Sequence, residues 1–318
     1  MKKLGIAAFL FIFLFGFLAY RNISEQTEDT ITVNGGVTSE SQIIGNMIAE
    51  LIQHESDYHV KFLNNLVSAQ VDQVAMERGE LSIASVRYTG TDLVTTLGKK
   101  IIKDHEKALK VVQSEFASRY DQEWYPSYGF ANEFAFMVTK ETAQKYHLTK
   151  ISDLQKFSDK MKLGVDSGWY EREGDGYKAF TKAYQMKFGR VYPMQVGLLY
   201  NALHAEKYDV VLGYSTDGRI SSYGLVTLED DRHFFPPYDC SLVVDKKVLK
   251  KYPKLEALLH RLDGKIDTRT MQKLNYESDG KLIEPELIAR KFLQEHHYFR
   301  NAENSSKSGR SDERYSKE

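Results

Sequence analysis

The sequence predicts an α/β fold built as two lobes with a ligand cleft between them. Strand-like apolar runs alternate with amphipathic helices over residues 31–86, which is the order of a parallel sheet covered by helices. A second alternation of the same kind extends over residues 151–212. Because two strand-like segments join these units, we expect a discontinuous first lobe, residues 31–134 and 234–300, with residues 135–233 forming the second lobe.

The N-terminus predicts export. Met1-Lys2-Lys3 precede an uninterrupted apolar run from Leu4 to Tyr20, as in a signal peptide or a membrane anchor. The run is near the lower limit for crossing a bilayer, which takes about 17–25 residues. Because small residues at cleavage spacing are scarce near Ala19, we expect residues 1–21 to stay as an anchor, with cleavage and secretion as the alternative. Residues 22–30 then form a linker, and the folded part is extracytoplasmic on either interpretation.

The composition excludes several classes of protein. Lys and Arg total 43 and Asp and Glu total 44, so the formal net charge is -1. Without a basic stripe, nucleic acid is not an expected partner. Cys240 is the single cysteine, which rules out a disulfide within the chain and lipid attachment through an N-terminal cysteine. Residues 301–318 carry no apolar pattern and are expected to form a disordered tail.

The first lobe is expected to begin with a strand, a turn at residues 34–36 and an amphipathic helix. Ser39 and Gln42 have the spacing of a capping box, and the apolar residues after them fall on one helical face. Gly79 is suited to the end of the following helix. The elements expected in this lobe are strands at 31–33, 60–63 and 81–86, and helices that begin at Ser39, at 68 (ending at 77) and at 105 (ending at 119).

The middle and the C-terminal part of the chain show weaker patterns. An aromatic-dense segment at residues 124–130 precedes a strand at 134–138, which leaves the first unit. The other expected elements are helices at 151–161, 196–205, 254–262, 268–276 and 285–295, and strands at 162–165 and 210–212.

Polar and aromatic loops follow two of the predicted strands, at residues 87–91 and 214–218. Open α/β sheets bind ligands at the carboxyl ends of their strands. A third aromatic segment, residues 234–238, is stiffened by Pro236 and Pro237. Rings held around a cavity suit a cation without hydrogen-bond donors, such as a quaternary ammonium group. From the residues alone, Tyr214 and Tyr238 fit equally an ordinary position at the edge of a core.

The sequence offers no pattern for catalysis or metal binding. Its histidines form no H-E-x-x-H motif, and no G-x-S-x-G elbow surrounds a serine. Asp217 and Arg219 are expected to order a loop. Arg87 could meet a ligand carboxylate or form an ion pair that bridges the lobes. We expect a protein that is not an enzyme, with no cofactor and no metal.

Five short motifs occur together and in order: SES at 39–41, RYTG at 87–90, WYPSYGF at 124–130, GYSTDGRI at 213–220 and FFPPYDC at 234–240. In these motifs the chain resembles the substrate-binding proteins of glycine betaine, carnitine and choline ABC importers, the osmoprotectant-uptake type. The resemblance covers residues 31–300. It implies a two-lobed periplasmic-binding-protein fold of type II, with two crossing strands and a trimethylammonium ligand in an aromatic cage.

In such relatives the cage consists of four tyrosines. Three of these positions match Tyr88, Tyr214 and Tyr238, and the fourth is Phe134, whose ring keeps its π-face without a hydroxyl. Asn132 lies two residues before Phe134 and is included among the expected ligand-binding residues.

Two further positions bear on the ligand's polar end. Relatives often carry a glutamine where this chain has Gly36, which leaves the contact to that end open. Thr91 is the sixth expected ligand-binding residue, and threonine there accompanies betaine-type binding, whereas aspartate accompanies a preference for choline.

The resemblance also implies partners, namely an ABC permease and an ATPase, with the N-terminal segment attached to the membrane. The expected ligand is glycine betaine, carnitine or a similar osmoprotectant. The alternatives are choline or a bulkier betaine as the ligand, or a membrane-anchored sensor or interaction protein with the same fold. An extracytoplasmic enzyme would need a nucleophile–base pair or a metal set that the sequence lacks.

Overall fold

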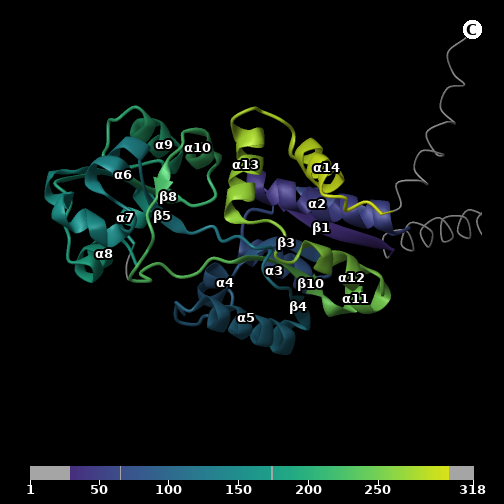
Figure 1. Cartoon of the computed structure of the whole chain (residues 1–318). Helices are drawn as coiled ribbons and strands as arrows, with labels where there is room; N and C mark the ends of the chain where they lie inside the picture. The colour runs from purple at the N-terminus through teal and green to yellow at the C-terminus, as the bar shows by residue number, and fades with distance from the viewer. Residues whose placement is uncertain (1–28, 65, 173–174, 301–318) are drawn as a thin grey trace, which may run out of the picture.

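The computed structural model describes residues 29–64, 66–172 and 175–300, and this part of the chain forms two lobes (Figure 1). Each lobe contains a five-stranded sheet; the strand orders are β2-β1-β3-β10-β4 and β7-β6-β8-β5-β9. In the first sheet these are β1 (Thr30–Gly36), β2 (His59–Asn64), β3 (Ile83–Tyr88), β4 (Gln122–Trp124) and β10 (Cys240–Asp245). In the second they are β5 (Phe134–Val138), β6 (Lys162–Asp166), β7 (Arg190–Met194), β8 (Val210–Tyr214) and β9 (Val226–Thr227).

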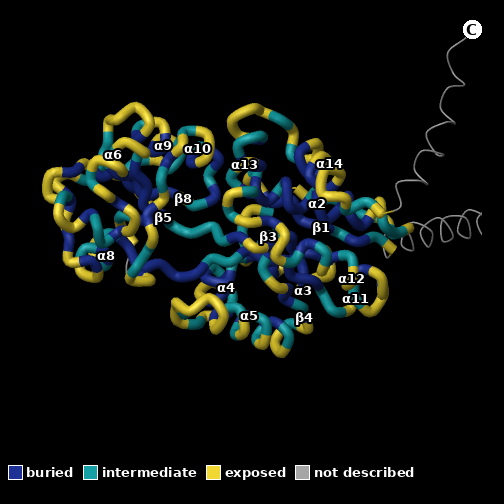
Figure 2. Tube along the Cα trace, viewed as in Figure 1, coloured by how far each residue is buried: buried dark blue, intermediate teal, exposed yellow. Residues whose placement is uncertain are grey.

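Helices cover both sheets. In the first lobe they are α2 (Ser39–Glu55), α3 (Ala69–Glu77), α4 (Thr89–Thr95), α5 (His105–Tyr120), α11 (Lys246–Lys251), α12 (Leu255–Leu259), the 3₁₀-helix η3 (His260–Leu262), α13 (Thr268–Asp279) and α14 (Pro285–Glu295). In the second they are α6 (Lys140–Tyr146), the 3₁₀-helices η1 (Ile151–Lys156) and η2 (Ser158–Lys160), α7 (Ser167–Tyr170), α8 (Tyr177–Tyr184), α9 (Val196–His204) and α10 (Gly218–Ser222). Figure 2 shows buried residues concentrated inside each lobe and exposed residues on the outer turns.

The parallel core of each sheet agrees with the alternation in the sequence. Strand β1 pairs in parallel with β2 and β3, and β6 pairs in parallel with β7 and β8. Each sheet also contains an antiparallel strand from a distant part of the chain: β10 lies against β3 and β4, and β5 lies against β8 and β9. The fold class, α/β with two lobes, is therefore confirmed.

Helix α2 shows both the success and the limit of the capping prediction. The helix begins at Ser39 as expected, but its capping box consists of Thr38 and Ser41 rather than Ser39 and Gln42. The Thr38 side chain accepts from the Ser41 backbone N–H at 3.2 Å, and the Ser41 hydroxyl lies 3.1 Å from the Thr38 backbone N–H. The predicted spacing was correct and its register was wrong by one residue.

Two other local predictions were wrong. Residues 87–91 are not a loop, because β3 continues to Tyr88 and α4 begins at Thr89. The expected α-helix at 151–161 is a pair of 3₁₀-helices, η1 and η2. In contrast, α14 has the predicted bounds, with a proline in its first turn where the missing N–H costs nothing.

The lobes are joined by two crossing segments that pair with each other. Ala131 and Asp239 form an antiparallel bridge, and the Asn132 N–H donates to the Tyr238 carbonyl at 3.1 Å. The side chains of Phe234 and Phe235 pack into the hydrophobic cluster of the second lobe. The crossing strands that the resemblance implied are thus present, next to the predicted site.

A second contact between the lobes lies at α13, which stands beside α10 in Figure 1. A Cβ atom on Gly218 would lie 2.4 Å from the backbone nitrogen of Tyr276, so the absence of a side chain permits this close approach. The Gln272 side chain donates to the Ser215 carbonyl at 2.7 Å, and Asn275 donates to the Thr216 carbonyl at 2.9 Å. The lobes therefore touch along one edge of the cleft.

The predicted N-terminal anchor and the predicted C-terminal tail lie outside the described residues. Of the helices in the described ranges, none has the length and apolar character to cross a membrane.

Candidate functional site

One cavity between the lobes, about 420 Å³ in volume, is lined by every site residue that the sequence predicted. Both sheets and both crossing segments contribute to it. The predicted residues are Tyr88 at the end of β3, Thr91 in α4, Asn132 and Tyr238 on the crossing segments, Phe134 at the start of β5 and Tyr214 at the end of β8. We call this space the cage chamber.

The second lobe supplies two neighbouring rings. Phe134 and Tyr214 are register partners of the antiparallel pair β5–β8, so their side chains lie on the same face of the sheet. Their ring centroids are 5.3 Å apart with an interplanar angle of 34°. Tyr214 is 36% exposed and lines the cavity.

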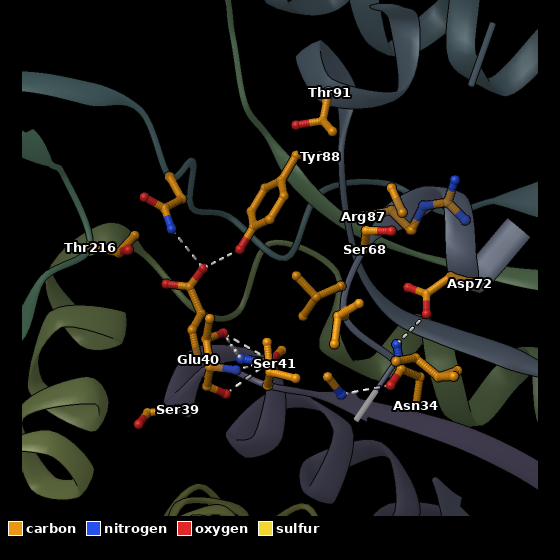
Figure 3. A pocket seen from close by; sticks show the side chains of 18 of the residues that line it. Asn34, Ser39, Glu40, Ser41, Ser68, Asp72, Arg87, Tyr88, Thr91 and Thr216 are labelled. Carbon is orange, nitrogen blue, oxygen red and sulfur yellow. Dashed lines mark hydrogen bonds between the residues drawn. The ribbon is translucent and has the colours of Figure 1, made fainter. Parts of the chain in front are cut away.

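The first lobe supplies Tyr88, whose ring is held by its hydroxyl. That hydroxyl donates to Glu40, a buried residue in the first turn of α2 (Figure 3). Asn132 donates to the same carboxylate at 3.1 Å. Burial, together with the nearby Glu40, raises the pKa of Tyr88 well above its usual value, so the hydroxyl stays a neutral donor. The sequence analysis missed Glu40, although the residue lies in the SES motif.

Gly90 explains how the crossing segment approaches α4. A Cβ atom there would lie 2.5 Å from the Pro237 carbonyl oxygen and 3.2 Å from the Tyr238 ring. The neighbouring Thr89 hydroxyl donates to the Pro237 carbonyl at 3.1 Å. The glycine of the RYTG motif therefore lets the proline turn place Tyr238 in the cage chamber.

Arg172 is a lining residue that the sequence analysis did not single out. Its guanidinium carbon lies 5.6 Å from the centroid of the Phe134 ring, within the range of a cation–π contact. The guanidinium lies 3.5 Å from the carboxylate of Asp175, which also lines the cavity. The nearby charge of Arg172 opposes the rise in the pKa of Tyr238 that burial causes. An internal cation therefore lies against one ring of the predicted cage.

A second space, about 520 Å³ in volume, adjoins the cage chamber and shares Tyr88, Thr91, Asn132 and Tyr214 with it. Figure 3 shows this region, with Glu40, Ser41, Asn34 and Asp72 on the side of the first lobe. Its polar lining includes the buried residues Asn34, Glu40, Ser41, Asp72, Arg87, Thr216 and Asn275.

Gly36 lies at the edge of this second space with a φ of +59°, a conformation that strains most residues. A Cβ atom there would lie 2.5 Å from the Ser41 hydroxyl. A side chain at this position would therefore disturb the cap of α2. The chain must hold the polar end of a ligand with other residues.

The expected ion pair between Arg87 and the second lobe was wrong. Its side chain is 1% exposed and binds Asp92 in the same lobe, with Nε donating to Oδ2 at 3.0 Å. Behind it, Asp72 accepts from the Asn34 amide at 2.7 Å, and burial raises the pKa of Asp72 to about 7 against the lowering effect of Arg87.

His105 connects the two crossing segments. Its Nδ1 lies 2.8 Å from the Asp239 carboxylate and its Nε2 lies 3.7 Å from the Glu133 carboxylate. The hydrogen bond with Asp239 raises the pKa of His105.

The other polar residues named from the sequence have local roles. Asp217 caps α10, and Arg219 binds its carboxylate at 2.9 Å, so both order the loop as expected. Within the described ranges, no group of three or more His, Cys, Asp or Glu side chains is arranged to hold a metal ion.

Comparison with known proteins places these features in a family. Residues 29–295 match the family model for the substrate binding domain of ABC-type glycine betaine transport systems. The chain is 49% identical over 304 residues to the carnitine transport binding protein OpuCC of Listeria monocytogenes serotype 1/2a (strain 10403S), covering 94% of this chain and 99% of that protein.

Two further similarities support this match. A solved structure of a glycine betaine/carnitine/choline ABC transporter protein superposes with a TM-score of 0.83 at 49% identity, covering 85% of this chain and 99% of that one. The ergothioneine transport permease/ergothioneine binding protein EgtU of Helicobacter pylori (strain G27) is 30% identical over 293 residues, which cover 91% of this chain and 52% of that protein.

The family is one of extracytoplasmic transport components with a type II binding-protein fold. Its model covers most of the chain, and a relative at 49% identity is covered almost completely. The chain therefore belongs to the family of substrate-binding domains of ABC-type glycine betaine transport systems.

Proposed function

We propose that this protein delivers a carboxylate-bearing quaternary ammonium compound, of the size of glycine betaine or carnitine, to an ABC permease and its ATPase. The observation that carries the proposal is the convergence of Tyr88, Phe134, Tyr214 and Tyr238 on one cavity between the lobes. These rings come from segments far apart in the chain, and a shared cavity is the arrangement that a cage requires.

The cage chamber suits a cation that has no hydrogen-bond donor. A primary ammonium group would lose its hydrogen bonds to water without recovering equivalent bonds among the ring faces. A trimethylammonium group has no N–H donor, so it leaves no hydrogen bond unmade in the cage. Glu40 lies behind Tyr88 and accepts from its hydroxyl. Its charge adds negative potential on the side of the chamber that the first lobe forms.

The ligand's carboxylate is proposed to bind Arg172 and Thr91. A guanidinium group presents a planar set of donors that matches a carboxylate, and a threonine hydroxyl adds another donor. Both residues line the cage chamber. On binding, the ligand's ammonium would replace the Arg172 guanidinium at the Phe134 ring while its carboxylate pairs with that guanidinium.

Because the rings belong to both lobes, binding is proposed to close the cleft about the crossing segments. Small-angle scattering should then show a more compact particle at saturating ligand. The proposal places the protein outside the cytoplasm, with residues 1–21 as its membrane anchor.

Titration calorimetry of the full-length protein with glycine betaine, carnitine, choline and glycine tests the proposed function. We expect glycine betaine or carnitine to bind and glycine, which has the same carboxylate with a primary amine, to show no measurable binding. Equal affinity for glycine betaine and glycine would contradict the cage.

A further inference from the structure

A group of lysines lies at the end of the first lobe that is remote from the cleft. The group falls within residues 246–254, in a chain whose formal net charge is only -1. It belongs to α11 and to the turn that follows this helix. We call it the lysine cluster, and its members are Lys246, Lys247, Lys250, Lys251 and Lys254.

The course of β10 explains why the lysine cluster is far from the ligand. Strand β10 runs antiparallel to β3, with Cys240 opposite Tyr88 at the cleft and Val244 opposite Ile83 at the other end. Helix α11 begins directly after β10, so the chain has crossed the sheet away from the cleft before it reaches the lysines. Figure 1 shows α11 and α12 at the end of the first lobe that is farther from the second lobe. The two cavities of the cleft are lined by other residues of the described ranges.

The chain enters the first lobe beside the lysine cluster. The Lys251 amine lies 3.1 Å from the carboxylate of Asp29, and β1 begins at the next residue, Thr30. The proposed membrane anchor ends at residue 21, so only residues 22–28 separate it from this ion pair. An extended chain spans at most about 3.6 Å per residue, which gives this linker a reach of roughly 25 Å. The lysine cluster therefore stays close to the bilayer that holds the anchor.

The positions of the lysines work against the helix that carries them. Lys246 and Lys250, like Lys247 and Lys251, are equal charges four residues apart, a spacing at which they repel. The helix dipole favours lysine only in the last turn and opposes Lys246 and Lys247 in the first. An anionic partner outside the chain would offset both costs.

Acids of the chain neutralise only part of this charge. Lys246 lies 3.6 Å from Glu123, and Lys251 is paired with Asp29. Lys247, Lys250 and Lys254 are exposed. The lysine cluster therefore presents an excess of positive charge to its surroundings.

The backbone under the lysine cluster is fixed by packing. The buried Tyr252 lies against Tyr58, with ring centroids 4.8 Å apart. The Lys254 backbone N–H donates to the Tyr58 hydroxyl at 3.4 Å, and the next residue, Leu255, is fully buried. The lysine side chains can adapt while their backbone keeps its place, which suits contact with a fluid array of headgroups.

We propose that the lysine cluster binds the anionic lipid headgroups of the bilayer that holds the N-terminal anchor. The proposal goes beyond ligand delivery and rests on the proposed anchor. Basic side chains are attracted to an anionic bilayer within about a Debye length, ~8 Å at physiological salt. Because the family is extracytoplasmic and the cluster adjoins the attachment point, a lipid surface fits it better than a nucleic acid. In this orientation the cleft faces away from the bilayer, toward the solution that contains the ligand.

Acetylation of lysines in the full-length protein on vesicles tests the proposal. The vesicles consist of phosphatidylcholine alone or of an equimolar mixture with phosphatidylglycerol, and a membrane-impermeant reagent labels the amines for mass spectrometry. Lys247, Lys250 and Lys254 should react about fivefold more slowly on the mixture, the factor expected for a lysine at an anionic surface. Lys187 and Lys207, exposed on the second lobe, should react equally on both. In about 1 M salt, where the Debye length is about 3 Å, the difference should disappear.

Two triple variants connect the slow reaction to the lysine cluster, with Lys251 as the reporter in both. In the first variant, three exposed lysines of the cluster are replaced: Lys247→Gln, Lys250→Gln and Lys254→Gln. Lys251 should then react equally on the two kinds of vesicle. The matched control makes the same change of net charge at exposed positions of the second lobe: Lys182→Gln, Lys187→Gln and Lys207→Gln. Lys251 should still react slowly on the mixture in this control.

The outcomes separate the proposal from the ligand-binding function. Equal acetylation of the lysine cluster on the two kinds of vesicle overturns the proposal. If inorganic phosphate at matched ionic strength slows the reaction on phosphatidylcholine vesicles as strongly, the cluster binds a free anion and the proposal is overturned too. Flotation of the protein with neither kind of vesicle removes both the anchor and the proposal. Calorimetry with carnitine in solution tests the cage independently, and none of these results changes its outcome.

Discussion

The two walls of the cleft are built differently. On the wall of the first lobe, Glu40 is 4% exposed and accepts hydrogen bonds from Tyr88, Asn132 and Asn275. On the wall of the second lobe, Tyr214 is 36% exposed and Phe134 faces the guanidinium of Arg172. The first wall is preorganised by a buried network, whereas the second presents groups that a ligand must rearrange.

This difference separates stability from recognition. A buried hydrogen-bonded network contributes to the free energy of unfolding, and losing one partner leaves other groups unsatisfied. A half-exposed ring contributes little to the free energy of unfolding. It can still contribute fully to the binding free energy of a ligand that covers it. Variants on the first wall should therefore change both stability and binding, and variants on the second wall should change binding alone.

The largest effect is expected for Tyr88→Ala. The variant loses a ring of the first lobe and one donor to the buried Glu40, so the free energy of unfolding should fall by about 3 kcal/mol. Binding of carnitine should weaken as well, since a cage ring is missing. Chemical denaturation and calorimetry on the same samples measure the two quantities, and an unchanged stability would show that the first wall is not preorganised by this network.

The second prediction concerns Asp72, the buried acid behind the first wall, and the pH dependence of the free energy of unfolding. Because the pKa of Asp72 in the folded protein is about 7, above its value in the unfolded chain, the folded state binds the proton more strongly. The stability contribution is therefore present at low pH and is lost as the pH rises toward 7. From pH 5 to pH 8 the parent should lose about 2–3 kcal/mol through this group.

Asp72→Asn should remove this part of the pH dependence while keeping an oxygen that accepts from Asn34. Asp57→Asn, at an exposed position, is the control and should leave the pH dependence as it is in the parent. Denaturant unfolding of the three proteins at pH 5 and pH 8 measures the difference. A parent whose stability rises over this interval, with the same rise in Asp72→Asn, would contradict the assignment.

On the second wall, Tyr214→Ala should weaken carnitine binding by about 1–2 kcal/mol through the lost cation–π contact. Its melting temperature should stay close to that of the parent, because the ring is partly exposed already. Thermal unfolding without ligand and calorimetry with carnitine check the two halves of the prediction. A large fall in melting temperature would place Tyr214 with Tyr88 and remove the contrast between the walls.

The sequence predicted the rings of the cleft better than the network behind the first wall. Tyr88, Tyr214 and Tyr238 lie in the motifs that carry the family resemblance, Phe134 could be named only through that resemblance, and the structure brings all four to one cavity. Glu40 could not be assigned its role, because its partners Asn132 and Asn275 are remote in sequence. Only the fold brings these donors to one carboxylate.

The same limit applies to the fold. Parallel strands separated by helices leave a local alternation, so β1, β2 and β3 were predicted. Strand β10 follows the proline turn and pairs with β3 across a long stretch of chain, and no local pattern marks that pairing. Arg172 was missed for a similar reason: its position at the Phe134 ring depends on how the segment after β6 folds back, not on its neighbours in the sequence.

The smallest effect is expected for Phe134→Tyr. The substitution keeps the ring face that lies 5.3 Å from the Tyr214 ring and adds a hydroxyl at its edge, so carnitine affinity should change by less than about 0.5 kcal/mol. Phe134→Leu is the matched comparison, since it keeps an apolar side chain of similar size and removes the π-face. Its affinity should fall by about 1 kcal/mol. Calorimetry with carnitine distinguishes three cases. A loss of affinity in the leucine variant alone supports a cation–π role for Phe134, whereas equal losses in both variants show that the fit of the phenylalanine shape matters instead. No loss of affinity in either variant removes Phe134 from the cage.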